Sequence, residues 1–167
     1  MVETIVNDIV HFLEQYNIPK ELITFIIALF PILECRGALI AAKLFSIPWF
    51  KAFLITFVGN IIPIPFILLF INKIFDLLKK VPKVNKLIFW LEEKTLKKKG
   101  QIEKYGVWGL LIFVAIPLPG TGGWTGALLA SLLHIDIKKA FPIISIGVLI
   151  AGVIMSLVAY GLLGLVI

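Results

Sequence analysis

The sequence has little of what a soluble enzyme or a metalloprotein needs. It contains one cysteine, Cys35, and two histidines, so an internal disulfide is excluded and neither a metal site nor a cofactor is expected. The sequence shows no nucleophile–base arrangement and no paired-carboxylate arrangement of the kind that catalysis uses. We therefore expect no catalytic residues and expect that the protein is not an enzyme. There is also no long polar or Ser/Gly-rich linker, which predicts a single domain over residues 1–167.

The N-terminus lacks the basic region and the small-residue cleavage site of a signal peptide. We therefore expect the mature chain to begin at Met1. Residues 2–18 carry apolar side chains at helical spacing, which predicts an amphipathic helix that lies in the membrane interface or packs on the bundle.

What the chain does have is apolar residues, at 60% of its length with a mean hydropathy of +1.04. This is above the ~45–50% of soluble domains and indicates an all-α integral membrane protein, multi-pass in the plasma or inner membrane. Ten of its sixteen basic residues fall in a linker over residues 73–104. The positive-inside rule places that linker in the cytoplasm, as an interfacial helix whose partners are membrane lipids and not nucleic acid.

Two charged residues, Glu34 and Arg36, interrupt the first apolar run, which extends from Leu22 to Phe45. Each ionised side chain at a bilayer centre costs roughly 2.5–3.5 kcal/mol on insertion scales, so such residues mark a functional site by default. The alternative is that Glu34 and Arg36 only neutralise each other while the fold packs around them.

The centre of this run does not read as a continuous helix. Pro31 breaks the helical ladder and Gly37 permits unusual backbone angles. We expect a re-entrant hairpin with limbs at Leu22–Leu29 and Ala38–Phe45, each about half the length of a membrane span. The two charged residues, at i and i+2, would then share one site on an extended turn.

The next apolar run, from Trp49 to Ile71, is long enough to span the membrane. Asn60 lies near its middle and is followed by Pro63 and Pro65, which predicts a kinked helix whose freed carbonyls face protein or water. Asn60 is therefore a candidate for substrate binding, although helix packing explains it equally well.

The second interrupted run covers residues 106–133, with prolines and glycines crowded at its centre. This composition predicts a second re-entrant hairpin, and it matches neither a P-loop nor a dinucleotide-binding loop. A limb beginning near Thr121 would direct the positive end of a helix at its ligand; close helix packing through small residues is the alternative. The candidate binding residues are Arg36, Gly37, Asn60, Thr121, Gly122, Gly123, Trp124 and Thr125, and the candidate structural residues are Pro31, Pro117, Pro119, Gly120 and Gly126.

An internal repeat appears when the sequence is shifted by 88 positions. Lys51-Ala52-Phe53 then aligns with Lys139-Ala140-Phe141, while Pro31 aligns with Pro119 and Gly59 with Gly147. We interpret this as a duplication over residues 22–80 and 106–167, each half a hairpin followed by a spanning helix, the last one over Ala140–Ile167 and tilted or kinked at Pro142. One crossing per half makes the repeat inverted, so the hairpins enter from opposite faces; hairpins that cross fully would make the repeat parallel.

Three stretches carry a resemblance to a known family: Pro31-Ile-Leu-Glu34-Cys-Arg36-Gly37-Ala38, Gly59-Asn60-Ile-Ile-Pro63-Ile-Pro65 and Ala115-Ile-Pro117-Leu-Pro119-Gly120-Thr121-Gly122-Gly123-Trp124-Thr125-Gly126-Ala127. From Leu22 onward the chain resembles the small multidrug export protein family, which is similar to the DedA/VTT superfamily. That superfamily is associated with proton-linked translocation of undecaprenyl phosphate or phospholipid, through re-entrant hairpins that carry acidic residues and arginines. The resemblance implies roles for Glu34 and Arg36, but this chain has no arginine in its second hairpin.

Together these patterns favour a secondary transporter, a proton-linked flippase for an anionic lipid carrier such as a polyprenyl phosphate or a phospholipid. Arg36 would bind the anionic head group and Glu34 would carry the coupling proton. A small cationic-drug/proton antiporter is the alternative, and a membrane scaffold without transport is a third possibility. A homodimer is compatible with each.

Overall fold

The computed structural model describes residues 18–82, 84–97, 100, 105–118 and 120–162. Pro119 and, except for its last residue, the helix predicted over residues 2–18 lie outside these ranges. The described residues form helices and no strand, as predicted. In chain order the helices are α2 Lys20–Leu29, α3 Glu34–Leu44, α4 Trp49–Ile61, α5 Pro63–Leu78, α6 Asn85–Leu96, α8 Val107–Ala115, α9 Gly123–Leu132, α10 Ile137–Ser156 and the π-helical turn η1 Leu157–Leu162.

Two of the helical segments are long and apolar enough to cross a membrane, Trp49–Leu78 and Ile137–Gly161. The first consists of α4 and α5, which are separated only at Ile62, directly before Pro63. The interruption predicted at this proline is therefore present. The second segment begins three residues before the predicted start and contains Pro142 inside α10.

Each long segment is preceded by a pair of short helices, which we call the first hairpin (α2–α3) and the second hairpin (α8–α9). In both hairpins the first helix ends at a residue with extended backbone directly before a proline. Phe30 has ψ 134° before Pro31, and Ile116 has ψ 117° before Pro117. Because a following proline disfavours the α conformation, both helix ends are encoded locally.

The second helix of each hairpin joins its long helix through the same backbone turn. A residue in left-handed conformation lies at equivalent positions of the two joints, Ser46 with φ 56° and His134 with φ 55°. In both joints the following residue donates its N–H to a carbonyl five positions earlier, at 2.9 Å. Such a bond closes the last turn of a helix and satisfies one of its free carbonyls.

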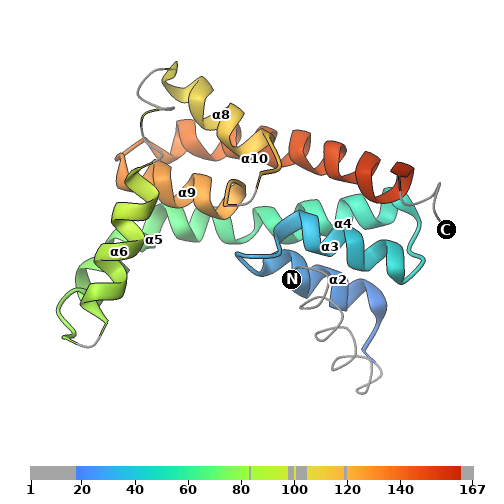
Figure 1. Cartoon of the computed structure of the whole chain (residues 1–167), viewed down its shortest axis with the longest axis horizontal. Helices are drawn as coiled ribbons and strands as arrows, with labels where there is room; N and C mark the ends of the chain where they lie inside the picture. Colours follow the sequence, from blue (N-terminus) through green and yellow to red (C-terminus); the bar gives the residue numbers. More distant parts are fainter. Residues whose placement is uncertain (1–17, 83, 98–99, 101–104, 119, 163–167) are drawn as a thin grey trace.

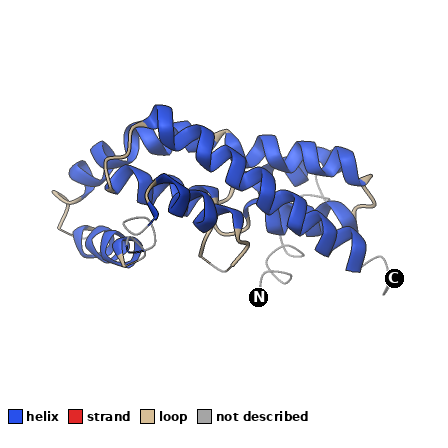
Figure 2. Cartoon of the chain, turned by 90° about the horizontal axis from the view of Figure 1, so that it is seen from above, coloured by secondary structure: helices blue, strands red, loops and turns tan. Residues whose placement is uncertain are grey.

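Figure 1 shows α10 running along the molecule in the direction opposite to α4 and α5. The first hairpin lies against α4, the second hairpin lies against α10 and α5, and α6 packs on α9 and α5. The view from above in Figure 2 shows the same elongated bundle. Many large apolar side chains face outward along the long helices, among them Phe66, Leu69 and Ile146, as expected for a surface in contact with lipid.

The prediction for the tip of the first hairpin was wrong in one respect. Glu34 and Arg36 do not lie on an extended turn, because both belong to the first turn of α3. The helical hydrogen bonds start earlier than predicted: Glu34 donates its N–H to the Phe30 carbonyl at 2.9 Å, and Gly37 donates to Leu33 at 2.8 Å. Glu34 itself has a φ of 46°, so a left-handed residue starts the helix and redirects its side chain.

Candidate functional site

The carboxylate of Glu34 is bound by the N-terminus of α9. Its side chain comes from the first hairpin and is buried, and its Oε1 accepts the N–H of Trp124 at 3.1 Å. The N–H of Gly123 also interacts with the carboxylate. The first N–H groups of a helix have no partner within the helix and carry partial positive charge. Glu34 therefore occupies the anion-binding end of α9, which the sequence predicted near Thr121 and which begins at Gly123.

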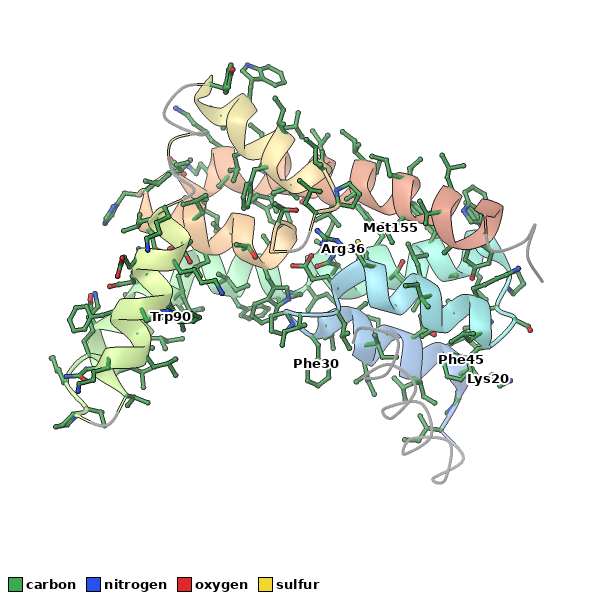
Figure 3. All side chains as sticks on the ribbon, in the orientation of Figure 1. Lys20, Phe30, Arg36, Phe45, Trp90 and Met155 are labelled. Carbon is green, nitrogen blue, oxygen red and sulfur yellow. The ribbon has the colours of Figure 1, made fainter. Side chains whose placement is uncertain are left out.

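The guanidinium of Arg36 is bound by the loop that precedes α9. It donates to the carbonyl of Leu118, to the carbonyl of Thr121 at 2.6 Å and to the Thr121 hydroxyl at 3.1 Å. Figure 3 places Arg36 at the centre of the molecule, where the two hairpins meet. Bonds from a charged donor are stronger than neutral ones, so Arg36 ties the two tips together.

The Thr121 hydroxyl also shapes this loop. Its oxygen accepts the N–H of Leu118 at 3.1 Å and lies 2.7 Å from the Ile116 carbonyl and 2.8 Å from the Leu118 carbonyl. Because a hydroxyl has one proton, it donates to one of these carbonyls at a time. Thr121 thus contributes both to the loop and to the binding of Arg36, and its selection for substrate binding stays a prediction.

Two glycines allow the hairpins to approach this closely. A Cβ on Gly122, whose φ is 137°, would overlap the Oε2 atom of Glu34. A Cβ on Gly123 would lie 3.0 Å from Val148 and 3.2 Å from the Asn60 Oδ1 atom. Any larger residue at Gly122 would push the carboxylate out of its position, and its backbone conformation is one that essentially only glycine adopts.

Asn60 lies beside this contact and is completely buried near the end of α4. Neither its amide oxygen nor its amide nitrogen has a hydrogen-bond partner within the described ranges. The sulfur of Cys35, in the first turn of α3, is the polar atom toward which the Asn60 amide N–H is directed as a donor. The sequence indicated Asn60 by its place in an apolar run, and Cys35 was not selected.

The two charged side chains do not form an ion pair with each other among the described residues. Instead, Glu34 binds N–H groups and Arg36 binds carbonyl groups of the same loop and helix end. Burial disfavours the charged form of Glu34, whereas the two N–H groups and the nearby guanidinium favour it. The described residues contain no group of three metal-ligating side chains.

Trp124 connects the charged contact to an apolar groove of about 530 Å³. Its backbone N–H binds Glu34, and Trp124 also lines the groove; its indole N–H is buried without a partner in the described part of the chain. The groove runs along α5 and exposes almost no polar atoms; its lining is Ile62, Pro63, Phe66, Ile67, Phe70, Ile71, Ile74 and Trp124.

Thr125 lies next to α6. It lines a smaller cavity of about 290 Å³ together with Gly120, Lys94 and other residues of α6 and the first hairpin. Sequence reasoning missed that α6 covers the second hairpin, because the pattern of this segment indicated only an amphipathic basic helix. Sequence reasoning also missed that the backbone carbonyls of Leu118 and Thr121 bind Arg36, because every residue has a carbonyl and the sequence does not show which ones take part.

The remaining candidate residues serve the hairpins themselves. A Cβ on Gly37 would meet Leu33 within its own hairpin, and a Cβ on Gly126 would overlap Val114 of α8. The nearest neighbours of Gly37 thus belong to its own hairpin, and its selection for substrate binding stays a prediction. Pro31 and Pro117 follow the extended residues that end α2 and α8, and Gly120 has φ 78° in the second loop.

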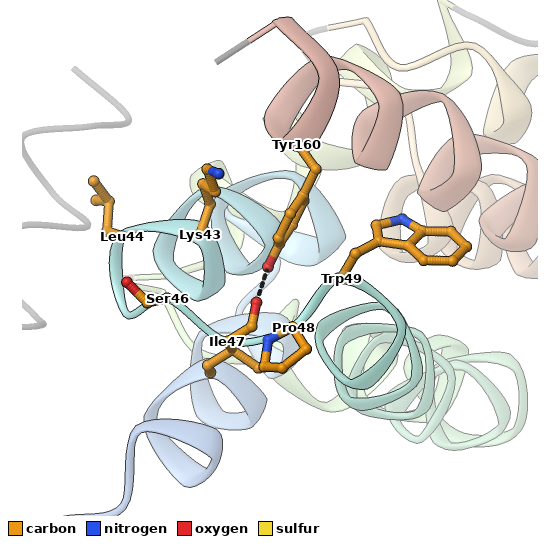
Figure 4. A pocket seen from close by; sticks show the side chains of 7 residues that line it. All are labelled: Lys43, Leu44, Ser46, Ile47, Pro48, Trp49 and Tyr160. Carbon is orange, nitrogen blue, oxygen red and sulfur yellow. Dashed lines mark hydrogen bonds between the residues drawn. The ribbon is translucent and has the colours of Figure 1, made fainter. Parts of the chain in front are cut away.

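A further cavity lies next to each of the two joints. One, of about 560 Å³, is lined by Lys43, Ser46, Tyr160 and neighbouring residues, and the Tyr160 hydroxyl donates to the Ile47 carbonyl at 2.9 Å (Figure 4). The other, of about 610 Å³, includes His134 and Lys139 at the second joint. Neither cavity contains a residue selected from the sequence.

Two long apolar helices, together with short paired helices that meet at a charged contact, indicate a helical membrane protein. Residues 34–154 match the family described as "Putative small multi-drug export protein". Because this match covers more than half of the sequence, the chain belongs to that family, whose name describes a membrane transporter. Comparisons with curated proteins and with solved structures gave no match.

Proposed function

We propose that this protein is a proton-linked secondary transporter for an anionic lipid carrier, of the polyprenyl-phosphate or phospholipid type. The observation that carries the proposal is the position of Glu34: a carboxylate of the chain itself occupies a helix N-terminus beside the Arg36 guanidinium. Helix N-termini and guanidinium groups are the common binding groups for phosphates. The same groups can therefore receive the head group of a substrate when Glu34 leaves.

The proposed topology is an inverted repeat of two re-entrant hairpins. Three observations support it. The long helices run in opposite directions, each is preceded by two short helices, and the joints at Ser46 and His134 have the same backbone conformation. The short helices have 9 to 11 residues, which at ~1.5 Å per residue is about half of a ~30 Å hydrocarbon core. The charged contact would then lie near the midplane, where inverted-repeat transporters bind their substrates.

Proton coupling follows from competition for the N-terminus of α9. An ionised Glu34 holds the N–H groups of Gly123 and Trp124 and so excludes a second anion. A proton on Glu34 removes its negative charge, which frees these groups and leaves Arg36 as the nearest charge for a head group. Proton and anion binding would thus support each other, and the two would be carried together.

The apolar groove next to Trp124 supports a substrate with a hydrocarbon chain. A head group at Arg36 and the N-terminus of α9 would lie at the backbone of Trp124, which also lines the groove. The exposed apolar surface of α5 continues from there toward lipid, as Phe66 and Phe70 show. A lipid chain could leave through this side without entering the protein core.

The second candidate is a small cationic-drug/proton antiporter, which the family name favours. In that case the drug would lie in the same groove and Glu34 would bind its positive charge. Arg36 opposes this assignment, because a guanidinium in the site repels a cation.

A transport assay in proteoliposomes separates these candidates. We expect an imposed proton gradient to drive movement of a fluorescent polyprenyl phosphate, and the Glu34→Gln variant to lose this coupling. Gly100→Ala is the matched control, because a Cβ at Gly100 would contact nothing within 4 Å. Exchange of a cationic dye for protons would support the drug antiporter instead. A failure to transport either probe would contradict the proposal.

A further inference from the structure

Asn60 is the one buried amide beside the Glu34 contact that no assigned role explains. It has no exposed surface, and neither amide atom makes a full hydrogen bond in the described ranges; its polar neighbour is the sulfur of Cys35, which is only a weak acceptor. Leaving a buried polar group unpaired is costly, so such groups usually have a partner in some state of the protein. The carboxylate of Glu34 lies against Gly122 and the amide of Asn60 lies against the adjacent Gly123.

The second half of the chain shows that packing alone does not require an amide at this place. At the offset of 88 residues, Asn60 corresponds to Val148. Val148 lies against the same residue, Gly123, at a distance close to that of Asn60. Gly123 therefore has an apolar neighbour from α10 and a polar neighbour from α4, and the polar group of Asn60 needs a chemical explanation.

We propose that Asn60 is the hydrogen-bond partner of Glu34 when Glu34 is protonated, so that it positions the proton carrier in its neutral state. This inference rests on the proposed function, which assigns the coupling proton to Glu34. The step is a single protonation from the aqueous phase, in which the carboxylate becomes a carboxylic acid and no other bond changes. The acid then leaves the N–H groups of α9 and turns to the amide.

A reciprocal pair of hydrogen bonds between the two groups can form only when Glu34 is neutral, because an ionised carboxylate has no proton for the amide oxygen. An ionised carboxylate accepts hydrogen bonds and donates none, which suits the N–H groups of Gly123 and Trp124. A carboxylic acid has one donor and one acceptor, and a primary amide offers one of each in return. Asn60 can thus form two hydrogen bonds with protonated Glu34 and satisfy its own unpaired atoms.

The surroundings contain few groups that could replace Asn60 in this role. Arg36 is the charged side chain that acts on Glu34, and the thiol of Cys35 is the neighbouring titratable group. Helix α9 has no charged residue, and the charged residues of α2, α4 and α10 lie in their first turns, at or near Lys20, Lys51 and Lys138. Asn60 is neutral at every pH and therefore adds a partner without adding a charge.

The variant Asn60→Val tests the inference with little risk to folding. It introduces the residue that the equivalent position of the other half carries, and it removes an unpaired buried amide. We therefore expect its melting temperature to equal or exceed that of the wild type. Asn72→Val is the control: Asn72 lies on the same long helical segment but donates to the Ser131 carbonyl at 3.0 Å, away from the hairpin tips.

Infrared difference spectroscopy of the full chain in lipid vesicles, between acidic and neutral pH, reports the partner directly. Protonated Glu34 should give a carboxylic C=O stretching band that is lost in Glu34→Gln. In Asn60→Val this band should move to higher frequency, because the acid has lost hydrogen bonds, while Asn72→Val should leave it unchanged. If Asn60→Val does not fold, Asn60→Ala gives the same readout.

The outcomes distinguish the inference from the function on which it rests. A Glu34 band that is unmoved in Asn60→Val would overturn the role of Asn60 and leave Glu34 as the proton carrier. The absence of any band sensitive to Glu34→Gln would overturn both assignments. An equal shift in Asn60→Val and Asn72→Val would mean a general change in packing and would also overturn the inference.

Discussion

The first and second hairpins are alike where they join the long helices and different where they touch each other. Their joints share the left-handed residues Ser46 and His134 and the same closing hydrogen bond. At the tips, the first hairpin supplies the charged side chains of Glu34 and Arg36, whereas the second supplies backbone N–H and carbonyl groups. The first hairpin therefore carries the charged side chains, and the second hairpin supplies the backbone groups that bind them. Neither tip has its hydrogen-bond partners without the other.

The largest expected effect comes from Gly122→Ala. The added Cβ would overlap Glu34 and would force alanine into a glycine-only conformation, so we expect a loss of about 3 kcal/mol in the free energy of unfolding. Gly106→Ala is the matched control, because Gly106 also has positive φ but nothing within 4 Å of its Cβ position, and its cost should be about 1 kcal/mol. Thermal unfolding in detergent measures both, and equal losses would contradict a tight contact at Gly122.

A smaller loss of stability is expected when Arg36, one of the two charged residues at the tip of the first hairpin, is made neutral. Arg36→Gln leaves the Leu118 and Thr121 carbonyls without a strong donor and removes the charge nearest to Glu34, at a cost of about 2–3 kcal/mol. The double variant with Glu34→Gln should recover part of this loss, because no uncompensated charge remains, while transport stays lost.

The two effects of Arg36 can be separated by Arg36→Lys, which keeps the charge but not the planar guanidinium. Its stability should lie between that of the wild type and Arg36→Gln. Melting temperatures and liposome flux of the four proteins check this prediction. A double variant that transports normally would disprove the assignment of both residues to the site.

The smallest effect is expected at the outer end of the first hairpin, where Lys51 and Glu21 form an ion pair at 2.7 Å. The pair lowers the pKa of the exposed Glu21 below its ordinary value, so its contribution is present above that value and is lost as the pH falls through the lowered one. Lys51→Gln should reduce the melting temperature slightly at neutral pH and not at all in acid. At the offset of 88 residues Lys139 corresponds to Lys51 and Gly109 corresponds to Glu21. Because glycine has no carboxylate, Lys139→Gln should have no such pH dependence.

Much of the fold could be predicted because its causes are local. Pro31 and Pro117 end the first helix of each hairpin, and Pro63 separates α4 from α5. Long apolar runs predicted the two long helices, since only helices or closed barrels satisfy the backbone in lipid. The starts of α3 and α10 were less accurate, because helix boundaries depend on neighbours as well as on the residue itself.

The partners at the site could be predicted only in part. The cost of charge in an apolar run identified Glu34 and Arg36, and the expected helix N-terminus in the second run is the group that binds Glu34. Nothing in the sequence identifies the Leu118 carbonyl as a partner, because every residue has one. The left-handed conformation of Glu34 could not be predicted either. The side chain of Glu34 binds Trp124, which lies 90 residues away in the sequence, so no local pattern indicates this conformation.

The contact between positions 34 and 122 limits how such a protein could be assembled. The two positions correspond to each other at the offset of 88 residues, so a symmetric dimer of identical half-length chains would bring two copies of one residue together there. Two glutamates would place carboxylates against each other, and two glycines would leave no charge at all. A single chain whose halves have diverged escapes this restriction, and it can keep an acid on one side of the contact and space for it on the other.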